Sequence, residues 1–96
     1  LLGEKLPAQQ AFDWGMITRV VEDAAVMSTA QEYAKRLAKG PTHALGLTRK
    51  LLWAAGDASF ETQLAAESSA QGAAGRHPHF AEGVAAFLEK RKANFD

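Results

Sequence analysis

The sequence predicts an all-α fold of about five short helices joined by short turns. Three observations lead to this prediction: glycine and proline recur at short intervals, apolar residues fall between them at helical spacing, and alanine is abundant. The 96 residues suffice for one small domain, and 47% hydrophobic with 23% charged residues is a globular composition. We therefore expect residues 1–96 to form a single helical domain.

The first part of the chain is predicted to hold one short helix and one extended segment. Pro7 suits the first helical position of a helix that runs to Trp14, and Gly15 suits its left-handed stop. Residues 16–21 are β-branched or apolar and favour a strand. No second strand is predicted, so this segment either pairs with sequence outside the chain or is an extended connector.

Four more helices are predicted after residue 22, each with an apolar stripe. The third helix has apolar residues on two sides, which predicts contacts on both. The expected stripes are Val26, Ala30, Tyr33, Ala34 and Leu37; then Leu45, Thr48, Leu52 and Ala55, widened by Leu47 and Leu51; then Phe60, Leu64, Ser68 and Gln71; and last Phe80, Val84, Phe87, Leu88 and Arg91.

Caps and breaks place the helix boundaries. Asp23 is expected to cap the second helix, and Ser59 the fourth, with Glu61 in its first turn. Gly40-Pro41 and Gly56-Asp57 are expected to separate the helices between them. His77-Pro78 begins the last helix, where His79 and Glu82 have the spacing of a capping box, although histidine is a poor cap.

Composition excludes several classes of function. Eleven basic and eleven acidic residues give zero formal net charge, which offers no basis for binding nucleic acid. The chain has no cysteine, so it has no disulfide scaffold or thiolate zinc site, and a reducing, cytoplasmic location is expected. Its apolar runs are far shorter than the roughly 20 residues that span a bilayer, so no membrane contact is expected. No basic segment followed by an apolar run opens the chain, so no secretory signal is expected.

Few residues are candidates for chemistry. His77 and His79 stand two positions apart and are expected to point to different sides, so no metal site is predicted. No nucleophile elbow or phosphate loop is present. The carboxylate pairs Glu61 with Glu67 and Glu82 with Glu89 are expected to be solvated, so no catalytic residue is predicted. The cluster Lys90, Arg91 and Lys92 beside Phe87 is expected in the last helical turn, where it either holds a phosphate and an adenine or is a solvated helix end.

The order of several motifs resembles the C-terminal part of the crotonase (enoyl-CoA hydratase/isomerase) superfamily. The most specific motif is the ending Glu82-Gly83, Ala86-Phe87, Lys90-Arg91 and Phe95. Glu61-Thr62-Gln63-Leu64, Glu67, Gln71 and Ala74-Gly75-Arg76 resemble the epoxyphenylacetyl-CoA isomerase branch. The matching segments, residues 2–8, 11–17, 20–21, 40–50 and 82–95, are spread over nearly the whole chain in the family's order.

This resemblance implies that the chain is the C-terminal helical, trimerisation-type region of an acyl-CoA hydratase or isomerase. It then contributes contacts within a homo-oligomer, a trimer or a dimer of trimers, and part of a coenzyme A pocket, with no covalently bound cofactor. The resemblance places Phe87 and Lys90 at the adenine and phosphate end of coenzyme A in a neighbouring subunit. His79 departs from the family, where Asp is usual before Glu-Gly.

The resemblance also implies that the catalytic half lies elsewhere. In the family, two backbone N–H groups of an N-terminal spiral domain hold the thioester oxygen as charge develops on it. The chain begins at Leu1, and Leu1-Leu2-Gly3 is typical of a helix end with a glycine stop, so we expect it to begin within a longer protein. An inactive fragment of an enzyme is therefore predicted. The alternative is a self-contained helical interaction module without acyl-CoA chemistry.

Overall fold

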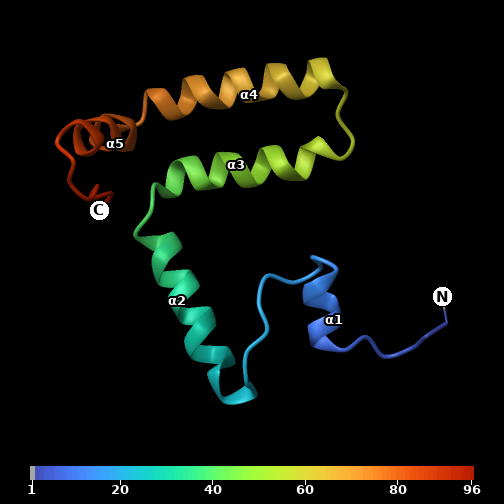
Figure 1. The fold of residues 1–96 in the computed structure, drawn as a ribbon. Coiled ribbons are helices and arrows are strands. Elements are labelled where there is room, and N and C mark those ends of the chain that lie inside the picture. The colour runs from blue at the N-terminus through green and yellow to red at the C-terminus, as the bar shows by residue number, and fades with distance from the viewer. Residues whose placement is uncertain (1) are drawn as a thin grey trace. The chain divides into compact units, whose positions relative to one another are not determined.

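The computed structural model describes residues 2–96 and confirms the all-α prediction for them (Figure 1). The chain divides into two units, the first ending at Glu32 and the second spanning Tyr33–Asp96. None of the described helices is both long and apolar enough to cross a membrane. The elements are α1 (Ala8–Asp13), a 3₁₀ turn (Asp23–Ala25), α2 (Val26–Ala38), α3 (Thr42–Ala55), α4 (Phe60–Gly75) and α5 (Pro78–Leu88).

In the first unit, α1 ends as its sequence predicts. Gly15 has a φ of +73°, its N–H donates to the Phe12 carbonyl, and the Met16 N–H donates to the Ala11 carbonyl. These two bonds form a Schellman motif, whose left-handed position favours glycine. Gly3 also has a positive φ, of +70°, as a glycine stop requires, whereas Leu1 lies outside the described residues.

Residues 16–21 form bends and irregular chain, and no strand occurs within residues 2–96, which agrees with the connector alternative. One expectation about the region after α1 is wrong. Asp23 does not cap α2 but begins the 3₁₀ turn, after Glu22 in extended conformation. Its backbone already belongs to the first turn, where its charge still faces the positive end of the helix dipole. The stripe predicted for α2 remains exposed, with Val26 52% and Leu37 56% accessible.

In the second unit, α3 packs against α4 and α4 against α5, and α3 and α4 run side by side (Figure 1). Ala44, Leu47 and Leu51 of α3 are half-buried at spacings of three and four residues, which places them on one face. Leu45 and Leu52 lie outside that face, and Leu52 is 71% exposed. The two-sided character predicted for α3 is therefore present, and one of its sides is uncovered.

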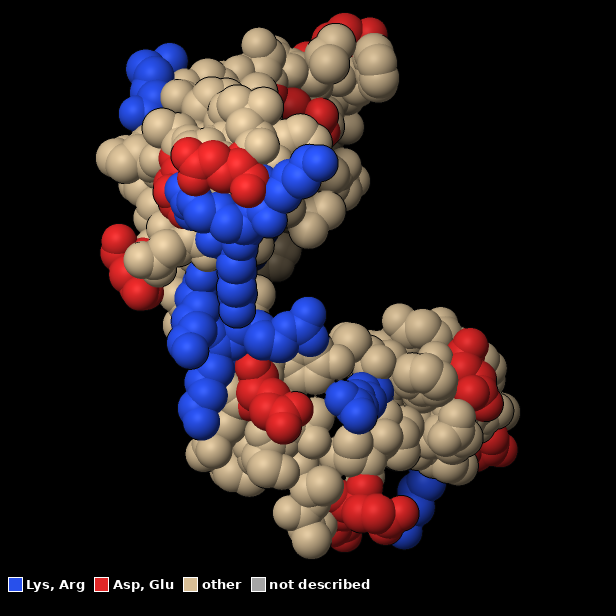
Figure 2. Space-filling view, turned by 60° about the vertical axis from the view of Figure 1, so that its left-hand side comes forward, with Lys and Arg blue, Asp and Glu red and all other residues tan. Residues whose placement is uncertain are grey.

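The stripes predicted for α4 and α5 lie on exposed faces. Phe60 and Leu64 of α4 are 76% and 56% exposed, whereas the half-buried positions include Ala66 and Ala70. In α5 the buried residue is Ala86, at 3% exposure. Small side chains let helix backbones approach closely, so α4 and α5 pack through alanines and leave their larger residues outside. On the face drawn in Figure 2, areas without charged side chains lie between patches of basic and acidic ones.

The predicted boundaries of α4 and α5 are largely confirmed. Ser59 caps α4, since its Oγ accepts a hydrogen bond of 3.2 Å from the Thr62 N–H. The cap of α5, however, is His77 rather than His79: Nδ1 of His77 accepts a 3.2 Å bond from the His79 N–H. Pro78 occupies the first turn, which forces the preceding residue into the extended conformation that a cap adopts.

Candidate functional site at the C-terminal end of α5

The end of α5 contains both predicted coenzyme A contacts. The helix ends at Leu88, so Lys90, Arg91 and Lys92 lie beyond it. The expectation that they lie in its last turn is therefore wrong. The Lys90 N–H donates to the Phe87 carbonyl at 3.3 Å, and the Arg91 N–H to the Ala86 carbonyl at 3.0 Å. This is a second Schellman motif, and it places Phe87 and Lys90 on either side of the helix end.

Lys90 occupies the left-handed position of this motif. Its φ is +53°, and within residues 2–96 no other residue apart from glycines has a positive φ. The left-handed conformation costs a residue with a Cβ roughly 1–2 kcal/mol. Glycine would avoid this cost, but lysine does not. Contacts with neighbouring residues must therefore hold Lys90 in this conformation.

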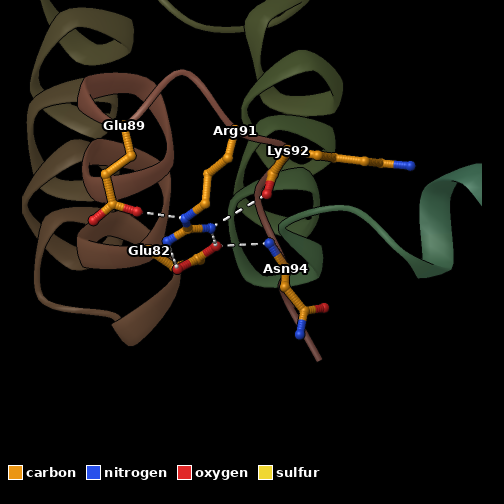
Figure 3. Close-up of polar contacts among 5 residues, drawn as sticks. All are labelled: Glu82, Glu89, Arg91, Lys92 and Asn94. Atoms are coloured by element: carbon orange, nitrogen blue, oxygen red, sulfur yellow. Dashed lines mark hydrogen bonds and ion pairs between the residues drawn. The ribbon is translucent and has the colours of Figure 1, made fainter.

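Four residues around the helix end form what we call the C-terminal clasp: Glu82, Glu89, Arg91 and Asn94 (Figure 3). The Glu82 carboxylate accepts bonds from Arg91 Nη1 at 2.6 Å and Nη2 at 3.0 Å, and from the Asn94 N–H at 2.7 Å. Arg91 Nε donates to Glu89 at 2.6 Å. A paired, bidentate guanidinium–carboxylate contact is both strong and specific in orientation, so the clasp ties residues 91–94 back onto α5.

Electrostatics reinforce the clasp. The hydrogen bonds from Arg91, followed by that from the Asn94 N–H, lower the pKa of Glu82 from 4.5 to about 2. The pKa of Arg91 is raised, first by its bond to Glu82 and then by that to Glu89. A carboxylate with so low a pKa is a poor proton acceptor at neutral pH, so Glu82 suits binding and not acid–base catalysis.

The clasp was missed in the sequence, where Glu82 and Glu89 were expected to be solvated. Glu82 has only 25% of its side chain exposed. The rules that relate charges on one helix reach three or four positions, whereas Glu82 and Arg91 are nine apart and meet only because the chain reverses after α5. The one available signal was the Glu-Gly and Lys-Arg pattern of the ending.

An open apolar groove of about 400 Å³ runs along α5, and His43 and Ala44 of α3 and Ala74 of α4 line its other side. Phe80, Val84 and Phe87 line it, together with Phe95 from the chain end. The Phe87 side chain is 83% exposed. A large aromatic ring so exposed is available for stacking against a flat ligand.

The three histidines meet at the opposite end of α5, contrary to the expectation that His77 and His79 diverge. The rings of His43 and His77 stack at 4.3 Å with an interplanar angle of 6°, and His79 meets His77 edge-on at 4.3 Å. They converge because His77 precedes the helix and turns back to cap it. Within residues 2–96, no group of three or more His, Cys, Asp or Glu side chains has a geometry that could hold a metal ion.

The fold should lose stability in mild acid at this histidine cluster. Desolvation first, and then the charges of His43 and His79, lower the pKa of His77 below its ordinary 6.5. The folded state thus binds the proton more weakly than the unfolded state, so the contribution is present above pH 6.5 and is lost as pH falls below it. Protonation of Nδ1 also removes the capping bond.

Thermal unfolding between about pH 8 and pH 5 tests this prediction. We expect the midpoint to fall below pH 6.5, and His77→Asn, which keeps a capping oxygen but cannot titrate, to flatten the curve. Glu82 remains ionised in the folded protein over this range, so the pH dependence is not assigned to it. An unchanged pH dependence in His77→Asn would contradict the assignment.

Comparisons with known proteins agree with this architecture. The sequence matches the enoyl-CoA hydratase/isomerase family over residues 1–96. It is 45% identical over 95 residues to 1,2-epoxyphenylacetyl-CoA isomerase of Escherichia coli K12, and 34% identical over 90 residues to 4-chlorobenzoyl coenzyme A dehalogenase-1 of an Arthrobacter species. These matches cover 99% and 94% of this chain but 36% and 33% of the relatives.

A solved structure of an enoyl-CoA hydratase from Polaromonas sp. JS666 is similar with a TM-score of 0.90 and 30% identity, over 96% of this chain and 36% of that one. The chain thus spans about a third of the length of the relatives it matches. The predicted resemblance, including that to the epoxyphenylacetyl-CoA isomerase branch, is confirmed. This chain belongs to the enoyl-CoA hydratase/isomerase family.

Proposed function

We propose that these residues are the C-terminal portion of an acyl-CoA hydratase or isomerase, where they form part of the coenzyme A pocket and contacts within a homo-oligomer. The observation that carries this proposal is the pairing of Phe87 and Lys90 at the end of α5. Phe87 is 83% exposed, and the N–H of Lys90 bonds to its carbonyl. An aromatic ring and an ammonium group suit an adenine and a phosphate, which coenzyme A carries close together.

The family assignment supports the substrate class. Judged by their names, the two relatives described above are enzymes that act on coenzyme A thioesters. The remaining two thirds of such a protein would supply the oxyanion donors and the acid or base. The exposed apolar faces of α2, α3 and α5 support contacts with other parts of the assembly. These points favour an enzyme segment over an unrelated helical module.

Replacing Lys90 in the full-length protein tests the proposal. Lys90→Ala is expected to raise KM for acyl-CoA and leave kcat nearly unchanged, because a remote contact made equally in ground and transition states gives uniform binding. The expected loss is about 0.5–1.5 kcal/mol, since an exposed phosphate contact is screened by salt. The defect should shrink at high ionic strength and should be absent with a pantetheine thioester, which lacks the nucleotide.

Lys90→Gly and Lys50→Ala are the matched controls. Glycine removes the same ammonium but relieves the left-handed strain of roughly 1–2 kcal/mol, part of which its own loss of backbone freedom offsets, so we expect the KM increase of Lys90→Ala together with a small gain in stability. Lys50 is an exposed lysine of α3, and its replacement should leave KM unchanged. An equal loss with the pantetheine thioester would show that Lys90 acts through folding or assembly, and the coenzyme A contact would be dropped.

A further inference from the structure

The conformation of Lys90 needs support from outside its own turn. Its left-handed backbone is unfavourable for a side chain with a Cβ, and the backbone of α5 holds this turn through two bonds, from the Lys90 and Arg91 N–H groups. Arg91 also bonds to Glu89, but one carboxylate, that of Glu82, joins both Arg91 and Asn94 to the body of α5. Glu82, in the second turn of α5, binds the guanidinium of Arg91 through both oxygens and also accepts the Asn94 N–H.

The geometry of these contacts fixes the direction in which the chain leaves α5. Arg91 and Asn94 are three residues apart, and both bond to the same carboxylate, so the segment between them cannot swing away from the helix (Figure 3). Arg91 Nη1 also donates to the Lys92 carbonyl at 3.2 Å. Lys90 is thus held between the helix end on one side and the Glu82 contacts on the other.

We propose that Glu82 is a positioning residue for the coenzyme A contact: it fixes the left-handed turn at Lys90, and so aims the ammonium group that meets the phosphate. This inference rests on the proposed function of Lys90. A preorganised cation loses less conformational freedom on binding than a mobile one, so loss of the clasp should weaken substrate binding without touching the chemical step.

Glu82→Gln in the full-length enzyme tests the inference, since it preserves the side-chain volume but removes the charge. We expect KM for acyl-CoA to rise roughly threefold to tenfold, close to the effect of Lys90→Ala, with kcat within about twofold and no change for the pantetheine thioester. Arg91→Lys keeps the positive charge but cannot bind the Glu82 carboxylate through two N–H groups, so it should give a smaller rise in KM. It provides a second test if Glu82→Gln folds poorly. Glu67→Gln, on the exposed side of α4, is the control and should leave both constants unchanged.

A double-mutant cycle separates positioning from general stability. If Glu82 acts through Lys90, Glu82→Gln adds little to KM in a Lys90→Ala background, although each change alone raises it. The inference would be overturned if the KM increases of the two single variants multiplied in the double variant. It would also be overturned if Glu82→Gln raised KM equally for the pantetheine thioester. A normal KM in Glu82→Gln beside a raised KM in Lys90→Ala would overturn it as well. If Lys90→Ala itself leaves KM unchanged, the proposed function fails and the inference fails with it.

Discussion

Purified residues 1–96 are expected to show no turnover of crotonyl-CoA or of a 3-enoyl-CoA. The described residues offer no convincing acid, base or oxyanion site, and the pKa of Glu82, about 2, makes it a poor base. Loss of one oxyanion donor alone costs roughly a hundredfold to a thousandfold in kcat, and a segment without the donors lacks that stabilisation altogether. This is therefore the largest effect that we expect.

The measurement is a spectrophotometric assay of each thioester, run beside a heat-treated sample of the same preparation. The full-length protein is assayed under the same conditions, and under the proposed function it is the positive control. Turnover by residues 1–96 above the heated sample would contradict the prediction and would place catalytic groups within this chain.

The same residues in isolation should self-associate. Leu52 and Trp53 are each 71% exposed on α3, although Arg49 covers one face of the Trp53 ring at 4.0 Å. Within the second unit the one buried hydrophobic residue is Ala86. Burying a large apolar side chain contributes about 1.5–3 kcal/mol, so a few such residues meeting across an interface can drive association.

Sedimentation at tens of micromolar, on the order of ordinary assay concentrations, should show species heavier than the 10.3 kDa monomer, and a hydrophobic dye should bind. Leu52→Lys should weaken association, because it places a charge on the uncovered face of α3. Leu47→Ala is the matched control: Leu47 lies on the half-buried face, so its loss should lower stability and leave association in place. A clean monomer without dye binding would refute the prediction.

The candidate site could be predicted only in part. The motif at the chain end identified Phe87 and Lys90 as candidates, and the structure brings their backbones together at the end of α5. Their contact with coenzyme A stays a prediction. The clasp was not predicted, because its central pair is separated by nine residues and by a reversal of the chain. The histidine cluster was also missed, since His43 comes from α3 and His77 precedes α5.

Local chemistry in the sequence determined the helix boundaries and the family. Gly15 and Ser59 act within a turn of their own position, through a permitted left-handed φ or a capping oxygen, so their effects do not depend on distant residues. Tertiary structure alone decided which face of each helix is packed. Apolar spacing marked the stripes with large residues, but α4 and α5 pack through alanines such as Ala70 and Ala86. Periodicity gives the direction of an apolar face, whereas the distance between helix backbones decides whether large or small side chains fit between them.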